Sequence, residues 1–374
     1  MRILAITNSR IPSLTANSIQ AMKVCDALAQ LGHMVKLIAP AEAPQVGWDE
    51  LAQHYGLKHP FALDWLPSVR LFRRLDFIWY AQKVAERFEP DLIYTWLPQS
   101  AAFALRRKYP VVLEMHADVA GHMGAWWLQR FWTGRGRKRL LVTTQALRIA
   151  LERSSGRSFP AGDVRIAPNG VDLDRYANLP DAARARRELH LPECLTAGFT
   201  GHFYRGRGVD LLFELARALP NISFMWVGGT AEAVEEWRAK LNATRVTNVA
   251  LTGFVENSKL PIHQAAADVL LMPYDRSISS SSGQDIAEVI NPMKMFEYMA
   301  ANRAIITADL PSIREVLDES CAVFCPPGDV GAWKASLDAL LSDGSRRARL
   351  ARRARQEVEK RTWLARAEQA LAGL

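Results

Sequence analysis

Short apolar runs alternate with longer segments of mixed polarity along the whole chain. In the first half the runs lie at Met1–Thr7, Met34–Ala39, Asp91–Thr95, Val111–Met115, Leu140–Thr144 and Val164–Ala167. In the second half they lie at Thr196–Thr200, Ile222–Val227, Val249–Gly253, Val269–Pro273, Ala304–Thr307 and Cys321–Cys325. Continuous apolar runs are typical of buried strands, and the segments between them are long enough for crossover helices. The pattern therefore predicts an α/β protein with parallel sheets.

The strand pattern is interrupted once, after Tyr176, by a stretch with proline, aspartate and several arginines that is typical of a connector. A chain of 374 residues is long enough for two domains. The regions that we predict are a first doubly wound, Rossmann-like domain over 1–175, a connector over 176–195, a second Rossmann-like domain over 196–358 and a final helix over 359–374.

A polar loop followed by an apolar helix, over 277–300, gives the strongest local indication of a ligand site. Residues 279–283 are four serines and a glycine, which predicts an exposed loop. We expect a helix that starts at Asn291, with Pro292 in its first turn, where a proline's missing N–H is not needed. The N–H groups of Met293 and Lys294, with the Lys294 charge, suit a phosphate.

Two further features suit a nucleotide. Glu297 is a carboxylate in an otherwise apolar helix, where it is placed to accept hydrogen bonds from ribose hydroxyls. A glycine-rich loop lies between a predicted strand and a helix over Asp210–Leu219, and it lets the backbone approach a ligand closely while its arginines neutralise a diphosphate. The residues of that loop are Gly201, Arg205, Gly206, Arg207 and Gly208.

The first half offers candidate acceptor contacts at two strand ends. The first loop carries Arg10 and then Asn17 and Ser18, which open a helix and present backbone N–H groups to a ligand; a plain helix cap is the alternative interpretation. This loop lacks the Gly-x-Gly-x-x-Gly fingerprint of dinucleotide enzymes. His116 ends another strand, and ends of parallel strands face the ligand in such folds. A structural histidine is the alternative there.

Composition limits the partners. Hydrophobic residues make up 49% and charged residues 23% of the chain, which is typical of a soluble protein, and no apolar run reaches the ~18 residues that span a bilayer. The first residues, MRILAIT, predict a strand and not a signal peptide, so we expect a cytoplasmic protein. The net charge of +8 favours anionic partners. The four cysteines, which have no metal-ligand spacing, are expected to be reduced core residues: Cys25, Cys194, Cys321 and Cys325.

Two segments, 61–80 and 121–140, combine aromatic and basic side chains. The first holds Trp65, Leu66, Arg70, Phe72, Arg73, Arg74, Phe77 and Trp79. The second holds Trp126, Trp127, Arg130, Phe131, Trp132, Arg135, Arg137, Lys138 and Arg139 without an acidic residue. One interpretation is peripheral docking on an anionic membrane surface, and the alternative is a partly buried helix with a solvated basic face. Nucleic acid is not expected, because no nucleic-acid-binding motif accompanies the charge.

The segment that begins at Pro292, PMKMFEYMAANRAIITADLPSIREVL, resembles the donor-binding segment of retaining glycosyltransferases with the GT-B fold, in particular glycosyltransferase family four. This resemblance implies two Rossmann-like domains with an interdomain cleft that holds the active site. It also implies that the final helix, from Arg361, packs back on the first domain with Trp363 as its anchor.

The resemblance also implies roles for single residues. In the family two glutamates bracket the donor; Glu297 matches the second, which binds ribose, whereas Val289 occupies the place of the first. Glu288 is the candidate for the missing sugar contact. Arg207 takes the place of the family's phosphate-binding lysine, and His202 that of its arginine. The base contacts would come from Gly253, Phe254 and Val255, although Phe254 and Tyr274 as core residues are the alternative.

These features together predict a metal-independent, retaining glycosyltransferase that moves a sugar from a nucleotide-diphosphate sugar to a hydroxyl acceptor, such as a glycolipid or polysaccharide precursor. His116, Glu288, Arg205 and Arg207 form the predicted catalytic set, with no cofactor. The Asp172-Leu173-Asp174 triplet is interpreted as structural and not as a metal motif. A nucleotide-sugar epimerase of the same fold and a non-catalytic nucleotide-sugar-binding protein are the alternatives.

Overall fold

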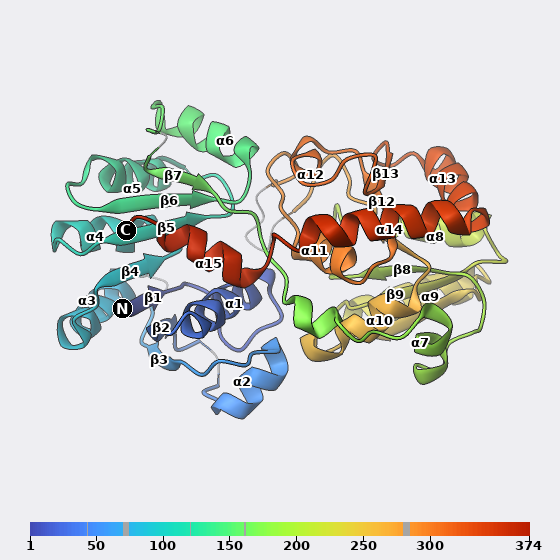
Figure 1. Ribbon diagram of the computed structural model, residues 1–374, viewed down its shortest axis with the longest axis horizontal. Helices are drawn as coiled ribbons and strands as arrows, with labels where there is room; N and C mark the ends of the chain where they lie inside the picture. Colours follow the sequence, from blue (N-terminus) through green and yellow to red (C-terminus); the bar gives the residue numbers. More distant parts are fainter. Residues whose placement is uncertain (43, 70–74, 120, 161, 280–284) are drawn as a thin grey trace. The chain divides into compact units, whose positions relative to one another are not determined.

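The computed structural model describes residues 1–42, 44–69, 75–119, 121–160, 162–279 and 285–374 (Figure 1). It divides into two compact units. The first contains Met1–Gly170 together with Trp363–Leu374, and the second contains Val171–Thr362. The first unit thus ends at Gly170 and not at 175, the returning segment begins at Trp363 and not at 359, and residues 176–195 belong to the second unit.

The first unit contains a parallel seven-stranded sheet whose order is β3-β2-β1-β4-β5-β6-β7. Its strands are β1 (Arg2–Ile6), β2 (Met34–Pro40), β3 (Ala62–Leu66), β4 (Leu92–Thr95), β5 (Val111–Met115), β6 (Lys138–Val142) and β7 (Val164–Ile166). Its helices are α1 (Ala16–Gln30), α2 (Trp48–Tyr55), α3 (Leu75–Phe88), α4 (Pro98–Arg106), α5 (Gly121–Thr133), α6 (Gln145–Ser155) and the returning α15 (Trp363–Leu371). Strand order reverses between β1 and β4, which is where doubly wound folds place ligands.

The second unit repeats this plan with a parallel six-stranded sheet of order β10-β9-β8-β11-β12-β13. Its strands are β8 (Thr196–Thr200), β9 (Ser223–Val227), β10 (Val249–Gly253), β11 (Val269–Met272), β12 (Ala304–Ala308) and β13 (Val323–Cys325). Its helices are α7 (Ala182–Glu188), α8 (Val209–Ala218), α9 (Ala231–Ala243), α10 (Leu260–Ala266), α11 (Met293–Ala300), α12 (Pro311–Arg314), α13 (Val330–Ser342) and α14 (Gly344–Val358), with 3-10 turns η2 (Leu173–Tyr176) and η3 (Asn257–Lys259). The order reverses between β8 and β11.

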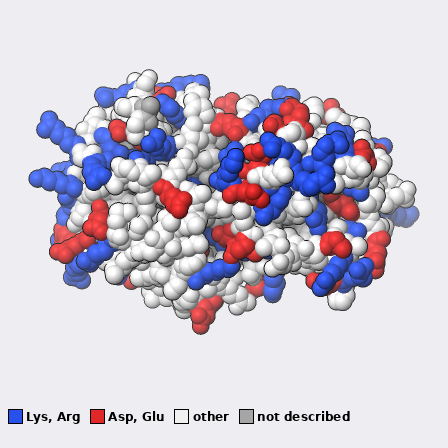
Figure 2. All heavy atoms as spheres, in the orientation of Figure 1, with Lys and Arg blue, Asp and Glu red and all other residues white. Residues whose placement is uncertain are grey.

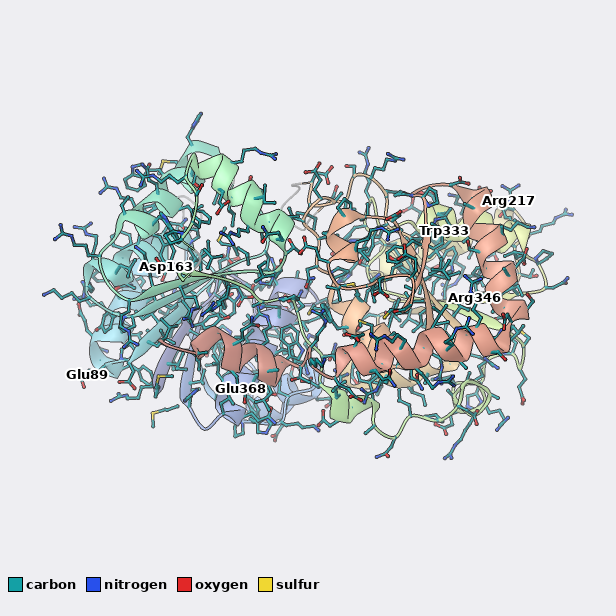
Figure 3. The ribbon with its side chains drawn as sticks, turned by 45° about the horizontal axis from the view of Figure 1, so that its top comes forward. Glu89, Asp163, Arg217, Trp333, Arg346 and Glu368 are labelled. Atoms are coloured by element: carbon teal, nitrogen blue, oxygen red, sulfur yellow. The ribbon has the colours of Figure 1, made fainter. Side chains whose placement is uncertain are left out.

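The α/β prediction with two parallel sheets is confirmed, and its physical basis is visible in the burial of the strands. All residues of β4, β5, β8, β9, β11 and β12 are buried. Each unit has large side chains in its interior; Trp333, from α13, is fully buried among the side chains of the second unit (Figure 3). Cys25, Cys321 and Cys325 are buried, but Cys194 is exposed, so its assignment to the core was wrong.

The segment 61–80 is not one helix. Ala62–Leu66 forms the edge strand β3, and α3 begins at Leu75. The Trp65 indole N–H donates to the Ile11 carbonyl oxygen over 2.8 Å, which ties this edge strand to the first loop. Arg70, Phe72, Arg73 and Arg74 lie outside the described residues. In α3, Phe77 is buried while Trp79 is 56% exposed, so the helix is amphipathic.

In α5 the pattern is similar. Leu128 and Phe131 are buried, whereas Met123 and Trp126 are exposed.

Lysine and arginine side chains are interspersed with acidic ones over the face of the molecule shown in Figure 2. Across the part of the chain that the structure describes, none of the helices has the length and apolar character needed to cross a membrane.

Candidate functional site

The glycine-rich loop between β8 and α8 packs backbone to backbone against the segment that follows β11. Gly206 and Gly208 both have positive φ, 82° and 76°. A Cβ atom would lie 2.2 Å from the Ser277 carbonyl oxygen at Gly206 and 1.6 Å from the Pro273 carbonyl oxygen at Gly208, so only glycine fits. The Asp275 N–H donates to the Gly206 carbonyl oxygen over 3.1 Å, which joins the two segments.

Two positive side chains gather beside this junction. The Lys294 Nζ lies 4.0 Å from the ring centroid of Phe199 and 5.3 Å from that of Tyr274. The Arg207 guanidinium carbon lies 5.5 Å from the same Tyr274 ring. Burial, and then the Arg207 charge, hold the pKa of Lys294 well below its usual range, against the opposing effect of Glu297. Two neighbouring cations of which one is disfavoured in its charged form suit an anionic ligand. Arg205, in contrast, is exposed.

The helix start was predicted two residues too early. Helix α11 begins at Met293, and Pro292 is its N-cap residue without a side-chain cap bond. Pro292 has an extended backbone, with ψ of 133°, so it stays outside the helix, and Asn291 is buried before it. Met293 and Lys294 still occupy the first turn, where N–H groups have no partner within the helix.

Glu297 is held by a relay of neutral side chains. It is half-buried, and its Oε2 accepts a hydrogen bond of 3.1 Å from the Gln264 amide of α10. The Gln264 Oε1 in turn accepts from the Tyr176 hydroxyl over 2.9 Å. Burial, and then the Glu297 charge, raise the pKa of Tyr176 well above its usual value, so this phenol stays a donor. Sequence reasoning missed this relay; the only signal was a polar glutamine inside the apolar helix PIHQAAA.

Glu288 lies in an exposed turn just before α11. Nearby, the carboxylate of Asp285 accepts from the N–H groups of Ile278 and Ala287, both over 3.0 Å, and these bonds lower its pKa. The Asp285 carboxylate is therefore occupied by backbone hydrogen bonds, and it is not a candidate for a sugar contact. Residues 280–284, including Gly283, lie outside the described residues, so Glu288 stays a predicted sugar contact.

The predicted base contacts lie at the end of β10. Gly253 has a φ of 72° and its carbonyl oxygen accepts from the Gly228 N–H over 2.8 Å. Phe254 is 46% exposed and so is not a core residue, whereas Tyr274 is buried. Val255 is half-buried and packs on the α7 and α10 side of the sheet.

In the first unit the residue predicted at a strand end, His116, contacts a carboxylate that sequence reasoning left unused. The His116 Nε2 lies 2.5 Å from Oε1 of the buried Glu114 in β5. The Gln20 amide, from α1, donates to the same oxygen over 2.5 Å. The Tyr94 hydroxyl donates to Oε2. Arg366, from α15, donates to both oxygens, to Oε2 over 3.2 Å.

The charge of Glu114 is set by these partners. Burial alone would raise the pKa of Glu114, but the charges of Arg366 and His116 and their hydrogen bonds bring it down to about 2. Burial lowers the pKa of Arg366, but Glu114 and Tyr94 together raise it by more, so the pKa of Arg366 lies above its usual value. Glu114 and Arg366 therefore form a buried ion pair, and α15 lies beside α1 in this unit (Figure 1).

In the first loop, Ser18 has a structural role at the start of α1. Helix α1 begins at Ala16, with Thr15 as its cap residue, whose side chain accepts from the Ser18 N–H. The buried Ser18 hydroxyl donates to the carbonyl oxygens of Ser13 and Thr15 over 3.0 Å and 2.9 Å, as the helix-cap interpretation expects. Arg10 and Asn17 are exposed and stay predicted acceptor contacts.

The Asp172–Asp174 triplet lies at the start of η2, with Asp172 as its cap residue. Among the described residues no group of three or more histidine, cysteine, aspartate or glutamate side chains is placed to hold a metal ion. The structural interpretation of the triplet fits this placement.

Two family models match the chain, one for each half. Residues 18–175 match the model described as Glycosyltransferase Family 4, and residues 195–343 match the model described as Glycosyl transferases group 1. The two matched ranges follow the division into two units.

Curated relatives match parts of the chain. The D-inositol 3-phosphate glycosyltransferase of Xylanimonas cellulosilytica is 31% identical over 54% of this chain and 48% of its own length. The processive diacylglycerol alpha-glucosyltransferase of Acholeplasma laidlawii is 24% identical over 59% of this chain and 66% of its own length. The matches leave a third or more of each relative uncovered.

Among solved structures, the Anabaena protein HepE in complex with UDP and glucose superposes with a TM-score of 0.74 over 100% of both chains, at 18% identity. At this identity the likeness establishes the fold alone. The GT-B fold prediction is confirmed.

Proposed function

The chain belongs to glycosyltransferase family four, of the glycosyl transferases group 1, and we propose that it transfers a sugar from a nucleotide-diphosphate sugar to a hydroxyl acceptor. The observation that carries this proposal is the grouping of Arg207 and Lys294 at the first turn of α11, one turn before Glu297. Diphosphate and ribose are adjacent in every nucleotide-diphosphate sugar. A cationic cluster next to a carboxylate matches that adjacency.

Catalysis by this group would consist of stabilising the leaving diphosphate. Lys294 and Arg207 lie 5.3 Å and 5.5 Å from the centroid of the Tyr274 ring and supply positive charge where charge develops during bond cleavage. We propose that they take the role that a metal ion has in other glycosyltransferases. A bound diphosphate favours the charged form of Lys294, so it offsets the unfavourable burial of that ammonium group.

We extend the proposal to retention of configuration at the transferred sugar. Two carboxylates near the cluster are engaged in the fold, Glu297 with Gln264 and Asp285 with backbone N–H groups. This favours same-face attack, in which the leaving phosphate accepts the proton of the acceptor hydroxyl, over a covalent carboxylate intermediate.

For the acceptor we propose a glycolipid or polysaccharide precursor at the inner face of a membrane. The support is the exposed aromatic and basic face of α5, where the Arg130 guanidinium carbon lies 4.8 Å from the ring centroid of the 40% exposed Trp126. Aromatic rings at headgroup depth with arginines on phosphates are typical of peripheral docking. If vesicles of anionic lipid do not retain the protein at low salt, this part of the proposal is wrong.

The central test is a panel of nucleotide sugars, measured by thermal shift and donor hydrolysis in the presence of a chelator. We expect one donor to stabilise the wild-type protein, by ~2.7 kcal/mol at a hundredfold excess over its Kd, and to be turned over. Glu297→Gln should weaken both effects, while Glu288→Gln should reduce turnover more than binding. Turnover without an acceptor product would favour the epimerase, and binding without turnover would favour the binding protein.

A further inference from the structure

Glu114 connects three elements that are far apart in the sequence. Its Oε1 accepts hydrogen bonds from Gln20, His116 and Arg366, and its Oε2 accepts from Tyr94 and Arg366. Every one of these groups is able to donate, and a carboxyl group accepts at both oxygens without donating only when it is ionised. The arrangement of the site therefore requires a negative charge on Glu114.

This requirement fixes the hydrogen position on His116. Because the His116 Nε2 lies 2.5 Å from an oxygen that only accepts, the ring hydrogen must be on Nε2. In the neutral ring Nδ1 is then the acceptor. Nδ1 has no hydrogen-bond partner among the residues that the structure describes, and the side chain is 25% exposed.

Arg366 makes the largest contribution to keeping Glu114 ionised. The other groups that face Glu114 are the His116 ring, which in its charged form also lowers the pKa of Glu114, Gln20 and Cys25 of α1 and Tyr94 of β4, while the neighbouring strand β6 brings the apolar Leu141. Without Arg366, Glu114 loses the largest of the effects that lower its pKa, while the effect of burial, which raises it, remains. A protonated Glu114 carries an O–H group that donates, so it would compete with the Nε2 hydrogen of His116.

We propose that Glu114 and Arg366 are positioning residues that hold His116 with its hydrogen on Nε2, so that Nδ1 accepts a hydrogen bond from a sugar hydroxyl. The nature of the ligand rests on the proposed function, but the hydrogen position does not. The returning helix α15 thus supplies a residue that orders the acceptor-side site.

The test is nitrogen-15 NMR of histidine-labelled protein without any ligand, with the His116 signals assigned from His116→Asn. In the wild-type protein we expect the chemical shifts of a ring with hydrogen on Nε2 and none on Nδ1. Arg366→Met should lose this single form near neutral pH, whereas Arg366→Lys, which keeps the charge, should retain it. If Arg366→Met does not fold, Arg366→Gln removes the same charge and places a polar side chain, about as long as methionine, at this position.

Arg139→Met is the matched control, because the Arg139 guanidinium also holds α15, by donating to the Ala370 carbonyl oxygen over 2.9 Å, without contacting Glu114. It should leave the His116 signals unchanged. Equal changes in the Arg139 and Arg366 variants would mean that docking of α15 alone matters, and would overturn the proposal. Unchanged signals in Arg366→Met and Arg366→Gln would overturn it as well.

Transfer kinetics then separate this inference from the proposed function. With an active donor and acceptor pair, Arg366→Met should lower kcat about tenfold or more with a smaller change in the donor KM, and Arg366→Lys should recover most of the rate. If the NMR result is as expected but no nucleotide sugar is bound or turned over, the proposed function fails and the hydrogen position of His116 stands.

Discussion

Glu114 lies in a buried strand of the first unit and Glu297 in a helix of the second, and the fold treats these two carboxylates in opposite ways. Glu114 is buried and is neutralised by the arginine of a returning helix. Glu297 is half-buried and is held by a neutral amide, with Lys294 one turn away. The first carboxylate is committed to arranging another side chain, and the second remains placed for a ligand.

Removing Arg366 should produce the largest effect on stability. Arg366→Met leaves a buried carboxylate without its cation, which typically costs about 3–5 kcal/mol of unfolding free energy. Urea unfolding followed by tryptophan fluorescence measures this loss. Arg139→Met, which removes a bond to α15 without stranding a charge, should cost less than half as much; equal losses would contradict the importance of the Glu114 charge.

Removing Lys294 should reduce donor turnover strongly without reducing the stability of the protein. Lys294→Met should lower turnover of the donor by about 10²–10³-fold, because charge on the leaving diphosphate loses one of its partners. The unfolding free energy of the free protein should not fall, because the pKa of Lys294 shows that its charge is disfavoured there. Rates of donor turnover and urea unfolding on one preparation measure both. A variant that unfolds more easily but turns over the donor at the normal rate would contradict this prediction.

The response to acid should distinguish Glu114 further. Its pKa is lowered from 4.5 to about 2 on folding, so the stabilisation is fully present above pH 4.5 and is lost as the pH falls towards 2. The loss across this window should be on the order of 3 kcal/mol. Unfolding curves at a series of pH values measure it. Glu114→Gln should be less stable at neutral pH but should show a flatter decline in acid; an unchanged decline would contradict the ion pair.

Removing the relay behind Glu297 should give the smallest effect. Gln264→Leu removes the hydrogen bond to the Glu297 carboxylate and leaves the Tyr176 hydroxyl without its acceptor, so a loss of about 1–2 kcal/mol is expected. The donor KM should rise several-fold with little change in kcat. Tyr176→Phe should have a smaller effect than Gln264→Leu, since it keeps Gln264. Donor kinetics of the two variants measure this difference.

Much of the fold followed from local sequence patterns. Strands such as Val111–Met115 and Thr196–Thr200 were located to the residue, because buried parallel strands are continuous apolar runs. Strand β3 was missed because its sequence, ALDWL, carries an aspartate and stands next to arginines, as expected for a partly exposed edge strand. The start of α11 was predicted too early because a proline fits both an extended N-cap position and the first turn of a helix. The sequence Asn291-Pro292 does not distinguish the two.

The site was predictable only where it is built from consecutive residues. Gly206, Gly208, Lys294 and Glu297 lie in recognisable segments, and the structure gathers them in one unit. The partners of Glu114 are up to 252 residues away, and an arginine in RTWLARAEQ does not differ from its neighbours in the sequence. Pairing across that distance is a property of the folded topology, so no local pattern indicates it.

The pairing of Glu114 with Arg366 also sets an order of events during synthesis. A ribosome releases the first 170 residues long before it reaches Trp363, so the nascent first unit lacks one helix and the cation of its buried carboxylate. The second unit, Val171–Thr362, is by then complete and able to fold ahead of it. The surroundings of Glu114 and His116 are therefore completed only after α15 has been synthesised, later than the second unit.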